Sequence, residues 1–352
     1  MGEKMLAGSR TTPRLARLAS AAPIGALFAV FFATFVHLAI VWFIVPYPIA
    51  REPLRRKVAS LTQSAKPWLI VAGDSRAQVH VRPDVLAAKL YWPAETVVNV
   101  GIPVCESSGV LAAYREFADR FASNPIMLLS VSPYSVNDGV TDERFLGDEV
   151  LGSVSLTERL RLAPVKRALL GTFLPEKAWW RLLTEDPDER AALPAANGFL
   201  GGLADTSADL APDELARQVD ELRRCWFGRP HLAGIRWRLL ESDLRTLLDM
   251  GVQLVVLDSP VHPAVQKALA DTEAAEAFRQ FAAQLAELCA RWEVPLLRYT
   301  PQDFADCTVD EIFFNVTHLN VNGATVLSQR IGTDLGRLIY QGRLVKPTAA
   351  ER

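Results

Sequence analysis

The stretch Trp68-Leu-Ile-Val-Ala-Gly-Asp-Ser75 decides the fold of this chain. Residues 68–72 are a short apolar run, and the glycine after them is typical of a turn at the end of a buried strand. Ser75 follows where the strand would give way to a helix. A serine at that point lies at the edge of a sheet, and the helix N-terminus behind it favours developing negative charge.

Four further apolar runs have the length of buried strands, and they span residues 96–100, 126–132, 252–258 and 294–298. Between the runs, apolar residues recur at spacings of three and four, which indicates amphipathic helices. Those helices are expected over 106–121, 232–249, 273–291 and 321–341. The alternation predicts an α/β fold: a three-layer, flavodoxin-like parallel sheet of about five strands with helices on both faces.

The stretch from about residue 140 to 230 interrupts this alternation. It holds an apolar and basic segment, a glycine-containing turn and then an acidic helical pattern. We therefore predict one domain over residues 67–345, with a helical insertion between its third and fourth strands.

An uncharged apolar segment precedes the domain. Ile24 to Val45 is a run of 22 residues, long enough to cross about 30 Å of hydrocarbon. A buried soluble helix rarely runs this long without a polar face, and the apolar region of a cleaved signal peptide is usually shorter. The sequence thus predicts a tail over 1–23, one transmembrane helix over 24–46 and a basic, polar linker over 47–66.

The overall composition excludes several function classes. The chain has 352 residues and a formal net charge of −2, so nothing indicates a partner nucleic acid. Its four cysteines are scattered, without the Cys and His spacing of a zinc site. We expect no metal and no cofactor.

A second motif lies just before the last predicted helix. It reads Thr317-His318-Leu319-Asn320, followed by Asn322-Gly323-Ala324. A histidine in a loop that leads into a helix can act as general base to a serine across the sheet edge. A capping or surface histidine is the ordinary alternative. The pairing with Ser75 and the position after all five strands favour the base.

These blocks together resemble a known superfamily. Gly73-Asp74-Ser75 after the first strand, Asn99-Val100-Gly101 after the second, a polar loop after the third and the late His-Leu-Asn-x-x-Gly-Ala are similar to the conserved blocks of the SGNH (GDSL-like) hydrolases. The resemblance covers about residues 68–138 and 252–341. More narrowly, the chain resembles membrane-anchored members such as the alginate O-acetylation proteins and the D-alanine-transfer protein of teichoic acids.

The resemblance implies roles for individual residues. Ser75 would be the nucleophile, and His318 would be the base that takes its proton and returns it to the leaving group. The Gly101 N–H would join that of Ser75 in an oxyanion hole. Asn137 is the nearest candidate for a third donor, although it lies further from the strand end than the usual motif, and Asn99 is the alternative.

Position 315 departs from the superfamily pattern, which usually has an aspartate three residues before the histidine. This chain has Asn315, and an asparagine can orient an imidazole but cannot compensate the charge of an imidazolium. Three outcomes are open. Ser75 and His318 could work as a dyad with Asn315 orienting the ring, Asp310 or Glu311 could serve as the acid, or the site could bind without catalysing.

Two further residues are candidates for substrate binding. His262 follows the fourth strand and could face the same edge, but Pro260 and Pro263 already explain the segment as a rigid turn. Arg76 could bind an anionic sugar or a phosphate group, or it could be solvated.

The function that the resemblance implies is that of a membrane-anchored O-acyltransferase or esterase acting on an extracytoplasmic polysaccharide or envelope polymer. It implies a single-pass protein of the cytoplasmic membrane with its domain on the periplasmic side, although basic residues flank the apolar segment almost equally on both sides. The partners would be the lipid bilayer, the polymer and a membrane-bound O-acyltransferase. The alternatives are an impaired domain that binds glycan or scaffolds a transferase, and a lipase or thioesterase that merely carries an anchor.

Overall fold

The computed structural model of the protein describes residues 25–35, 51–63, 66–103, 105–139, 155, 157–158, 198–199, 211–304 and 306–347. The chain divides into two units, Met1–Tyr47 and Pro48–Arg352. The predicted tail, the second half of the predicted membrane segment and most of the predicted insertion over 140–230 lie outside the described residues.

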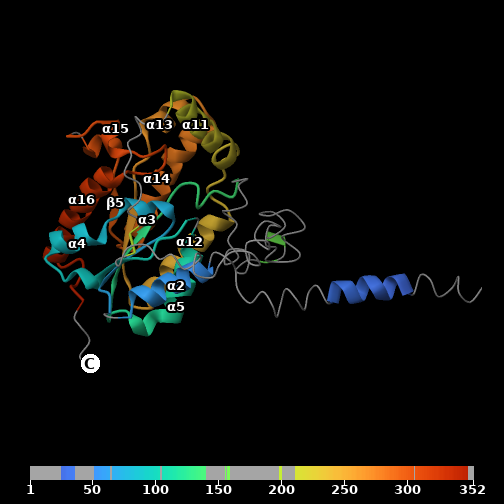
Figure 1. Cartoon of the computed structure of the whole chain (residues 1–352), viewed down its shortest axis with the longest axis horizontal. Helices are drawn as coiled ribbons and strands as arrows, with labels where there is room; N and C mark the ends of the chain where they lie inside the picture. Colours follow the sequence, from blue (N-terminus) through green and yellow to red (C-terminus); the bar gives the residue numbers. More distant parts are fainter. Residues whose placement is uncertain are drawn as a thin grey trace, which may run out of the picture. The chain divides into compact units, whose positions relative to one another are not determined.

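The first unit contains a helix over residues 25–35, drawn in blue in Figure 1. Its large apolar side chains are exposed, among them Leu27, Phe31 and Phe35. Within the described ranges, no helix combines the length and the apolar character needed to cross a membrane.

The second unit contains a five-stranded sheet and the helices around it. Its elements, in chain order, are α2 (Arg51–Leu61), β1 (Leu69–Ala72), α3 (Ser75–His80), α4 (Pro83–Leu90), η1 (Ala94–Thr96), β2 (Val97–Asn99), α5 (Ser107–Phe117), η2 (Ala118–Arg120), β3 (Ile126–Ser130), α11 (Pro212–Trp226), α12 (Ile235–Asp249), β4 (Gln253–Asp258), α13 (Pro263–Leu269), α14 (Glu273–Arg291), β5 (Leu296–Arg298), η5 (Pro301–Phe304), α15 (Val309–Ile312) and α16 (Val321–Tyr340).

All pairs of neighbouring strands in the sheet are parallel, and the order is β2-β1-β3-β4-β5. Leu69 pairs with Val97 on one side and with Ile126 on the other. This is the doubly wound order of flavodoxin-like sheets, so the predicted parallel sheet of about five strands is confirmed. The chain reverses its winding between β1 and β3, and ligands in such sheets bind outside the carboxyl ends of the strands at that point.

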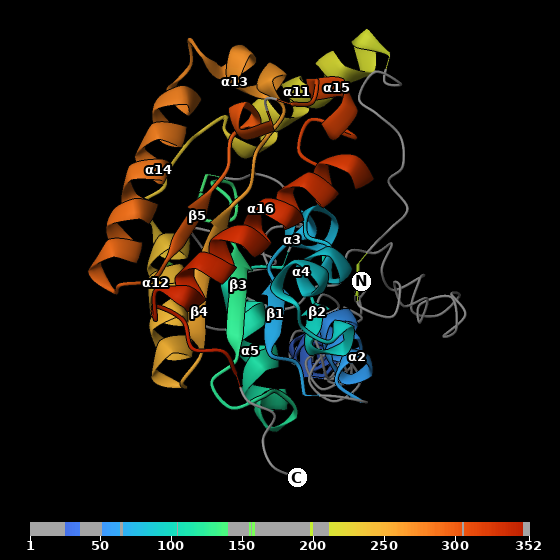
Figure 2. The ribbon, with the colours of Figure 1, turned by 90° about the vertical axis from the view of Figure 1, so that its left-hand side faces the viewer.

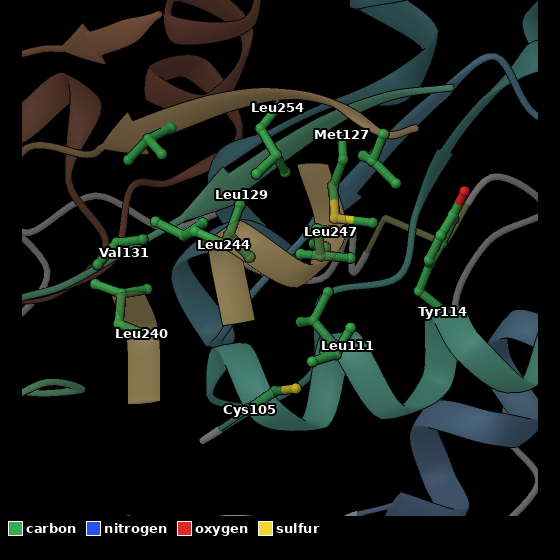
Figure 3. Packing of buried hydrophobic residues seen from close by; sticks show 14 of the residues in the cluster. Cys105, Leu111, Tyr114, Met127, Leu129, Val131, Leu240, Leu244, Leu247 and Leu254 are labelled. Carbon is green, nitrogen blue, oxygen red and sulfur yellow. The ribbon is translucent and has the colours of Figure 1, made fainter. Parts of the chain in front are cut away.

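The sheet separates two cores, because alternate residues of each strand face opposite sides. On one side, Met127, Leu129 and Leu254 pack against α5 and α12 (Figure 3). On the other side, Leu128 and Val255 pack with the buried faces of α4 and α16. Figure 2 shows α16 running across the strands. The strands are therefore covered on both faces, as their continuous apolar sequences predict.

The segment predicted as a linker over 47–66 is instead largely helical. Residues 51–61 form α2, whose Leu54 and Val58 are buried in the same core as α5. Lys57 is also buried, and its Nζ donates a hydrogen bond of 2.5 Å to the carbonyl oxygen of Gly101. Burial lowers the pKa of Lys57 to about 7. The polar composition of the segment concealed an apolar stripe of only a few residues, which is enough to dock a helix.

Helix α16 begins where the chain passes very close to α15. Asn320 caps the helix by accepting a hydrogen bond from the Gly323 N–H. A Cβ at position 323 would overlap the carbonyl oxygen of Ile312. Glycine is therefore required at this position for its small size.

Replacement of Gly323 by alanine should lower the free energy of unfolding by about 1–3 kcal/mol, because the added methyl group forces the two backbones apart. Gly336→Ala is the matched control on the same helix, since the nearest atom to its Cβ would be Leu90 Cδ2 at 3.9 Å. That control should be neutral or stabilising by up to about 1 kcal/mol. Urea denaturation of both variants tests the prediction, and equal effects would contradict it.

Candidate functional site

Ser75 begins α3 directly after the first strand. The turn is made by Gly73, whose φ of 128° suits only glycine and whose Cβ would lie 2.7 Å from the Ser130 carbonyl oxygen. Asp74 caps the helix by accepting a hydrogen bond of 2.9 Å from the Arg76 N–H. Ser75 is the one residue of α3 that is not buried. The turn thus presents its hydroxyl at the edge of the sheet.

A polar contact joins the ends of β1 and β3. Ser132 lies just beyond β3, and its hydroxyl donates a hydrogen bond of 3.1 Å to the second carboxylate oxygen of Asp74. This contact sits at the point where the winding of the sheet reverses. It ties the serine-bearing turn to the neighbouring strand end.

His318 lies in a tight loop between α15 and α16. Phe313 and Leu319 form an isolated antiparallel bridge across this loop, and the His318 carbonyl oxygen accepts a hydrogen bond from the Phe314 N–H. Leu319 has no exposed surface. The loop is therefore held by its own backbone and by a leucine anchored in the core.

The loop brings His318 to Ser75. The distance from His318 Nε2 to Ser75 Oγ is 2.9 Å, and the distance from His318 Nδ1 to Asn315 Oδ1 is 3.1 Å. Asn315 Oδ1 also accepts hydrogen bonds from the backbone N–H groups of Thr317 and His318, which fixes the orientation of the amide. An oxygen facing Nδ1 favours a proton there and leaves Nε2 unprotonated. That tautomer can accept the proton of Ser75.

The charge state of His318 is set mainly by burial. Burial lowers the pKa of His318 to about 4, with the positive charge of Arg76 acting in the same direction and the negative charge of Asp74 acting against it. No carboxylate accepts a hydrogen bond from the ring in the part of the chain that the structure describes. The imidazole is thus neutral near pH 7 and able to act as a base.

His80 is a buried neighbour of the site that sequence reasoning missed. It ends α3, the helix that Ser75 begins, and its Nε2 accepts a hydrogen bond of 3.1 Å from the Leu319 N–H. Its ring stands edge-on to that of His318 at 6.0 Å between centroids. Burial, together with the electrostatic effects of the neighbouring His318 ring and of the charged Arg76, puts the pKa of His80 well below its usual value. A neutral His80 therefore holds the loop that carries the base.

Gly101 and Asn99, predicted as oxyanion-hole donors, have other partners in this structure. The Gly101 N–H donates to Asn99 Oδ1 at 2.9 Å. Asn99 Nδ2 donates to the carbonyl oxygens of Ala77 and Val81, at 2.7 and 2.9 Å. These bonds clamp the end of β2 onto α3. The oxyanion role of the two residues stays a prediction, and it would require the Gly101 amide to be shared or released.

The side chain of Asn137 is also hydrogen-bonded to backbone groups. It has no exposed surface, and its Oδ1 accepts hydrogen bonds from the N–H groups of Gly139 and His231. The side chain thus joins the loop after β3 to the segment before α12. Its oxyanion role likewise stays a prediction.

The structure places neither acidic candidate at the ring of His318. Asp310 is exposed on α15, and its charge acts on His262, whose pKa it raises against the larger effect of burial. Glu311 caps the start of the same helix by accepting a hydrogen bond from the Thr308 N–H. At Nδ1 of His318, the position of a triad acid is taken by Asn315.

His262 and Arg76 are both buried. His262 caps α13 by accepting a hydrogen bond from the Ala264 N–H, and its own N–H donates to the Val316 carbonyl oxygen in the His318 loop. The structure therefore supports the turn role of His262. Arg76 points inward, donating to the carbonyl oxygens of Val131 and Ser259, so it is not a solvated side chain.

The pH dependence of the site can be tested at Asn315. In the wild-type chain, the rate at which a fluorophosphonate labels Ser75 should fall on the acid side with an apparent pKa of about 4, because a protonated His318 cannot accept the serine proton. Asn315→Asp places a carboxylate at Nδ1. It should shift this limb upward by ~1–3 pH units and raise the labelling rate at neutral pH.

The control for Asn315→Asp is Asn322→Asp, which makes the same charge change at an exposed position on α16. It should change the apparent pKa of the labelling rate on the acid side only a little, because solvent screens the added charge. Equal shifts in the two variants would show that Asn315 does not act directly on the ring.

The positioning role of His80 can be tested by His80→Leu. The substitution leaves the Leu319 N–H buried without its acceptor, which should cost about 1–3 kcal/mol of unfolding free energy and slow the labelling of Ser75. His80→Gln retains an acceptor and should recover part of both losses. The control His231→Leu, at a histidine that is 65% exposed, should change stability by less than about 0.5 kcal/mol. A normal labelling rate in His80→Leu would argue against the role.

Comparison with known proteins does not identify a family or a function for this chain. No family model and no curated protein matches this sequence. Among the described residues, no group of three His, Cys, Asp or Glu side chains is arranged to hold a metal ion. The functional interpretation therefore depends on the geometry around Ser75.

Proposed function

We propose that this chain is a membrane-anchored, SGNH-like O-acyltransferase or esterase that acts on an extracytoplasmic polysaccharide or envelope polymer through an acyl-enzyme on Ser75. The observation that carries the proposal is the 2.9 Å contact between Ser75 Oγ and His318 Nε2. Ser75 is partly exposed at a helix N-terminus, and His318 is neutral and fixed in orientation. These are the properties of an activated nucleophile and its base.

In the first half-reaction, Ser75 Oγ attacks the carbonyl carbon of an acyl ester while His318 Nε2 takes the hydroxyl proton. The tetrahedral intermediate collapses as the bond to the leaving oxygen breaks. His318 gives its proton to that oxygen, so an alcohol leaves and the acyl group stays on Ser75. The dipole of α3 favours the negative charge that develops beside its N-terminus.

In the second half-reaction, a hydroxyl group attacks the acyl-serine and His318 accepts its proton. The proton then returns to Ser75 Oγ as the acyl group departs. With a polymer hydroxyl as the attacking group the outcome is transfer, and with water it is hydrolysis. The same side chains serve both outcomes.

Asn315 makes the pair a dyad rather than a triad. Its oxygen orients the ring, but the imidazolium formed during the reaction gains no full countercharge from it. In a serine protease, changing the triad aspartate to asparagine costs about 10⁴ in turnover, with the wrong tautomer as the cause. Here the oxygen faces Nδ1, so the tautomer is the productive one and the penalty is expected to be smaller.

The proposed location rests on the apolar run Ile24 to Val45, whose length and lack of formal charge are those of a single membrane span. The domain would lie on the periplasmic side of the cytoplasmic membrane. An anchor raises the effective concentration of the enzyme near a membrane-bound O-acyltransferase or its polymer. The partners we propose are accordingly the bilayer, the polymer and such a transferase.

Ser75→Ala should abolish labelling of the full chain by a fluorophosphonate and should abolish acyl transfer from a p-nitrophenyl ester, because no other nucleophile replaces the hydroxyl. Ser242→Ala removes an exposed hydroxyl on α12 and should leave both activities unchanged. Labelling can be followed by gel fluorescence and mass spectrometry of the modified peptide. Labelling that persists in Ser75→Ala would overturn the proposal.

A second function is favoured by one observation, the amide of Asn315 at the place of a triad acid. On that reading the domain is catalytically impaired and binds glycan or scaffolds an acyl-transfer complex. The wild-type chain would then resist labelling, while Asn315→Asp would gain it. Labelling of the wild-type chain would exclude this alternative.

A further inference from the structure

A cavity of about 440 Å³ lies beyond the carboxyl ends of β4 and β5, within the size range of small-molecule sites. Its walls come from the ends of β4 and β5, including Asp258 and Arg298, from the turn after β4, from α13 and α14, and from the start of η5. Arg76 and Pro133 also line it. Neither Ser75 nor His318 lines it. The cavity therefore lies at the same edge of the sheet as the proposed site but is separate from it.

Arg76 gives the cavity an unusual polar end. The side chain has no exposed surface, and its two Nη atoms donate to the carbonyl oxygens of Val131 and Ser259, each at 3.2 Å. In the described part of the chain its Nε has no hydrogen-bond partner, and no carboxylate accepts a hydrogen bond from its guanidinium. Burying a charge is costly unless it is paired. The charges of Asp74 and Asp258 act on the guanidinium, but its Nε still lacks an acceptor. A ligand carboxylate in the cavity would supply that acceptor.

The other charged side chains of the lining are already matched. Arg298 Nε donates to Asp258 at 2.9 Å, and Arg279 donates to Glu276 at 2.7 Å from its Nη2. The charges of Asp74 and Asp258 also act on Arg76. Among the described residues, however, neither carboxylate accepts a hydrogen bond from its guanidinium, and its Nε has no acceptor. The hydroxyl of Ser259, also buried on this lining, has no partner there either and could donate to the same anion.

The remainder of the lining is mainly apolar. Phe278 and Phe281 of α14 contribute aromatic faces, and Val261 and Leu269 contribute aliphatic ones. A strongly hydrated ion such as phosphate would lose its water against these walls without compensation. A ligand with an anionic head and an apolar body would satisfy both parts.

We propose that this cavity binds a small monocarboxylate with an apolar chain. The carboxylate accepts hydrogen bonds from Arg76 Nε and the Ser259 hydroxyl, and the chain lies against Phe278 and Phe281. The binding needs no reaction at Ser75, so it stands apart from the proposed function.

Isothermal titration of the full chain in nanodiscs with sodium hexanoate tests the proposal, with empty nanodiscs subtracted. Hexanoate should bind with one-to-one stoichiometry, and 1-hexanol, which has the same chain without the carboxylate, should bind at least tenfold more weakly. Absence of saturable hexanoate binding would mean that Arg76 is structural only, and equal binding of the alcohol would remove the role of the carboxylate. Either result would overturn the proposal.

Variants locate the binding. Ala282→Phe fills the cavity from α14 and should raise the Kd for hexanoate at least tenfold, while Ala283→Phe, at the exposed neighbouring position, should leave it unchanged. Arg76→Gln removes the charge and should weaken binding at least tenfold. If Arg76→Gln does not fold, the comparison of Ala282→Phe with Ala283→Phe still tests the proposal.

Ser75→Ala separates this proposal from the proposed function. It should leave the Kd for hexanoate unchanged, whether or not Ser75 proves to be a nucleophile. Loss of hexanoate binding in Ser75→Ala, or an unchanged Kd in Ala282→Phe, would place the ligand elsewhere and overturn the proposal.

Discussion

Helix α3 and the loop that carries His318 hold each other at both ends of the helix. Ser75, the first residue of α3, contacts the ring of His318, and His80, the last, accepts the Leu319 N–H. Because the helix is only six residues long and otherwise buried, it acts as a rigid spacer between the two contacts. Loss of either contact would allow the loop to shift relative to the serine. The proposed chemistry depends on this double attachment.

Three glycines allow the backbones around this spacer to approach one another. Gly73 makes the turn into α3, Gly101 brings the end of β2 against Gln78, and Gly323 brings α16 against α15. In each case a Cβ would come within 3.0 Å of a backbone atom. Such contacts place the ends of β1 and β2 and the start of α16 around one point. Because these three residues have no Cβ, the backbones pack closely enough for the Ser75 hydroxyl to reach the His318 imidazole.

The electrostatics of the site follow from burial and from Arg76. The guanidinium is wholly buried, lowers the pKa of His318, and fixes the ends of β3 and β4 through the carbonyl oxygens of Val131 and Ser259. Asp74 works in the opposite direction on His318 while capping α3 and binding Ser132. With an amide at position 315, Asp74 and Arg76 are the charges that act on the pKa of His318, against a larger effect of burial. The same arginine forms the polar end of the neighbouring cavity, which links the two regions through one side chain.

The sequence by itself determined the five parallel strands and the helices between them, and it predicted that Ser75 pairs with His318. Consecutive apolar residues mark a buried strand, and the carboxyl ends of parallel strands share one edge, which accounts for the place of Ser75. His318 lies between α15 and α16, so its pairing with Ser75 was inferred from its motif and from the family resemblance. Only the tertiary structure decided which polar groups pair: His80 with Leu319, 239 positions apart, and Asn315 Oδ1, rather than Asp310, with the ring of His318. It also decided that α2 packs against the core and that Arg76 is buried. The hydrogen bonds of Gly101, Asn99 and Asn137 within the fold were likewise visible only in the tertiary structure. A hydrogen bond forms only within a narrow range of donor–acceptor distance and angle. A local pattern of residue types does not predict either quantity for residues that are far apart in the chain.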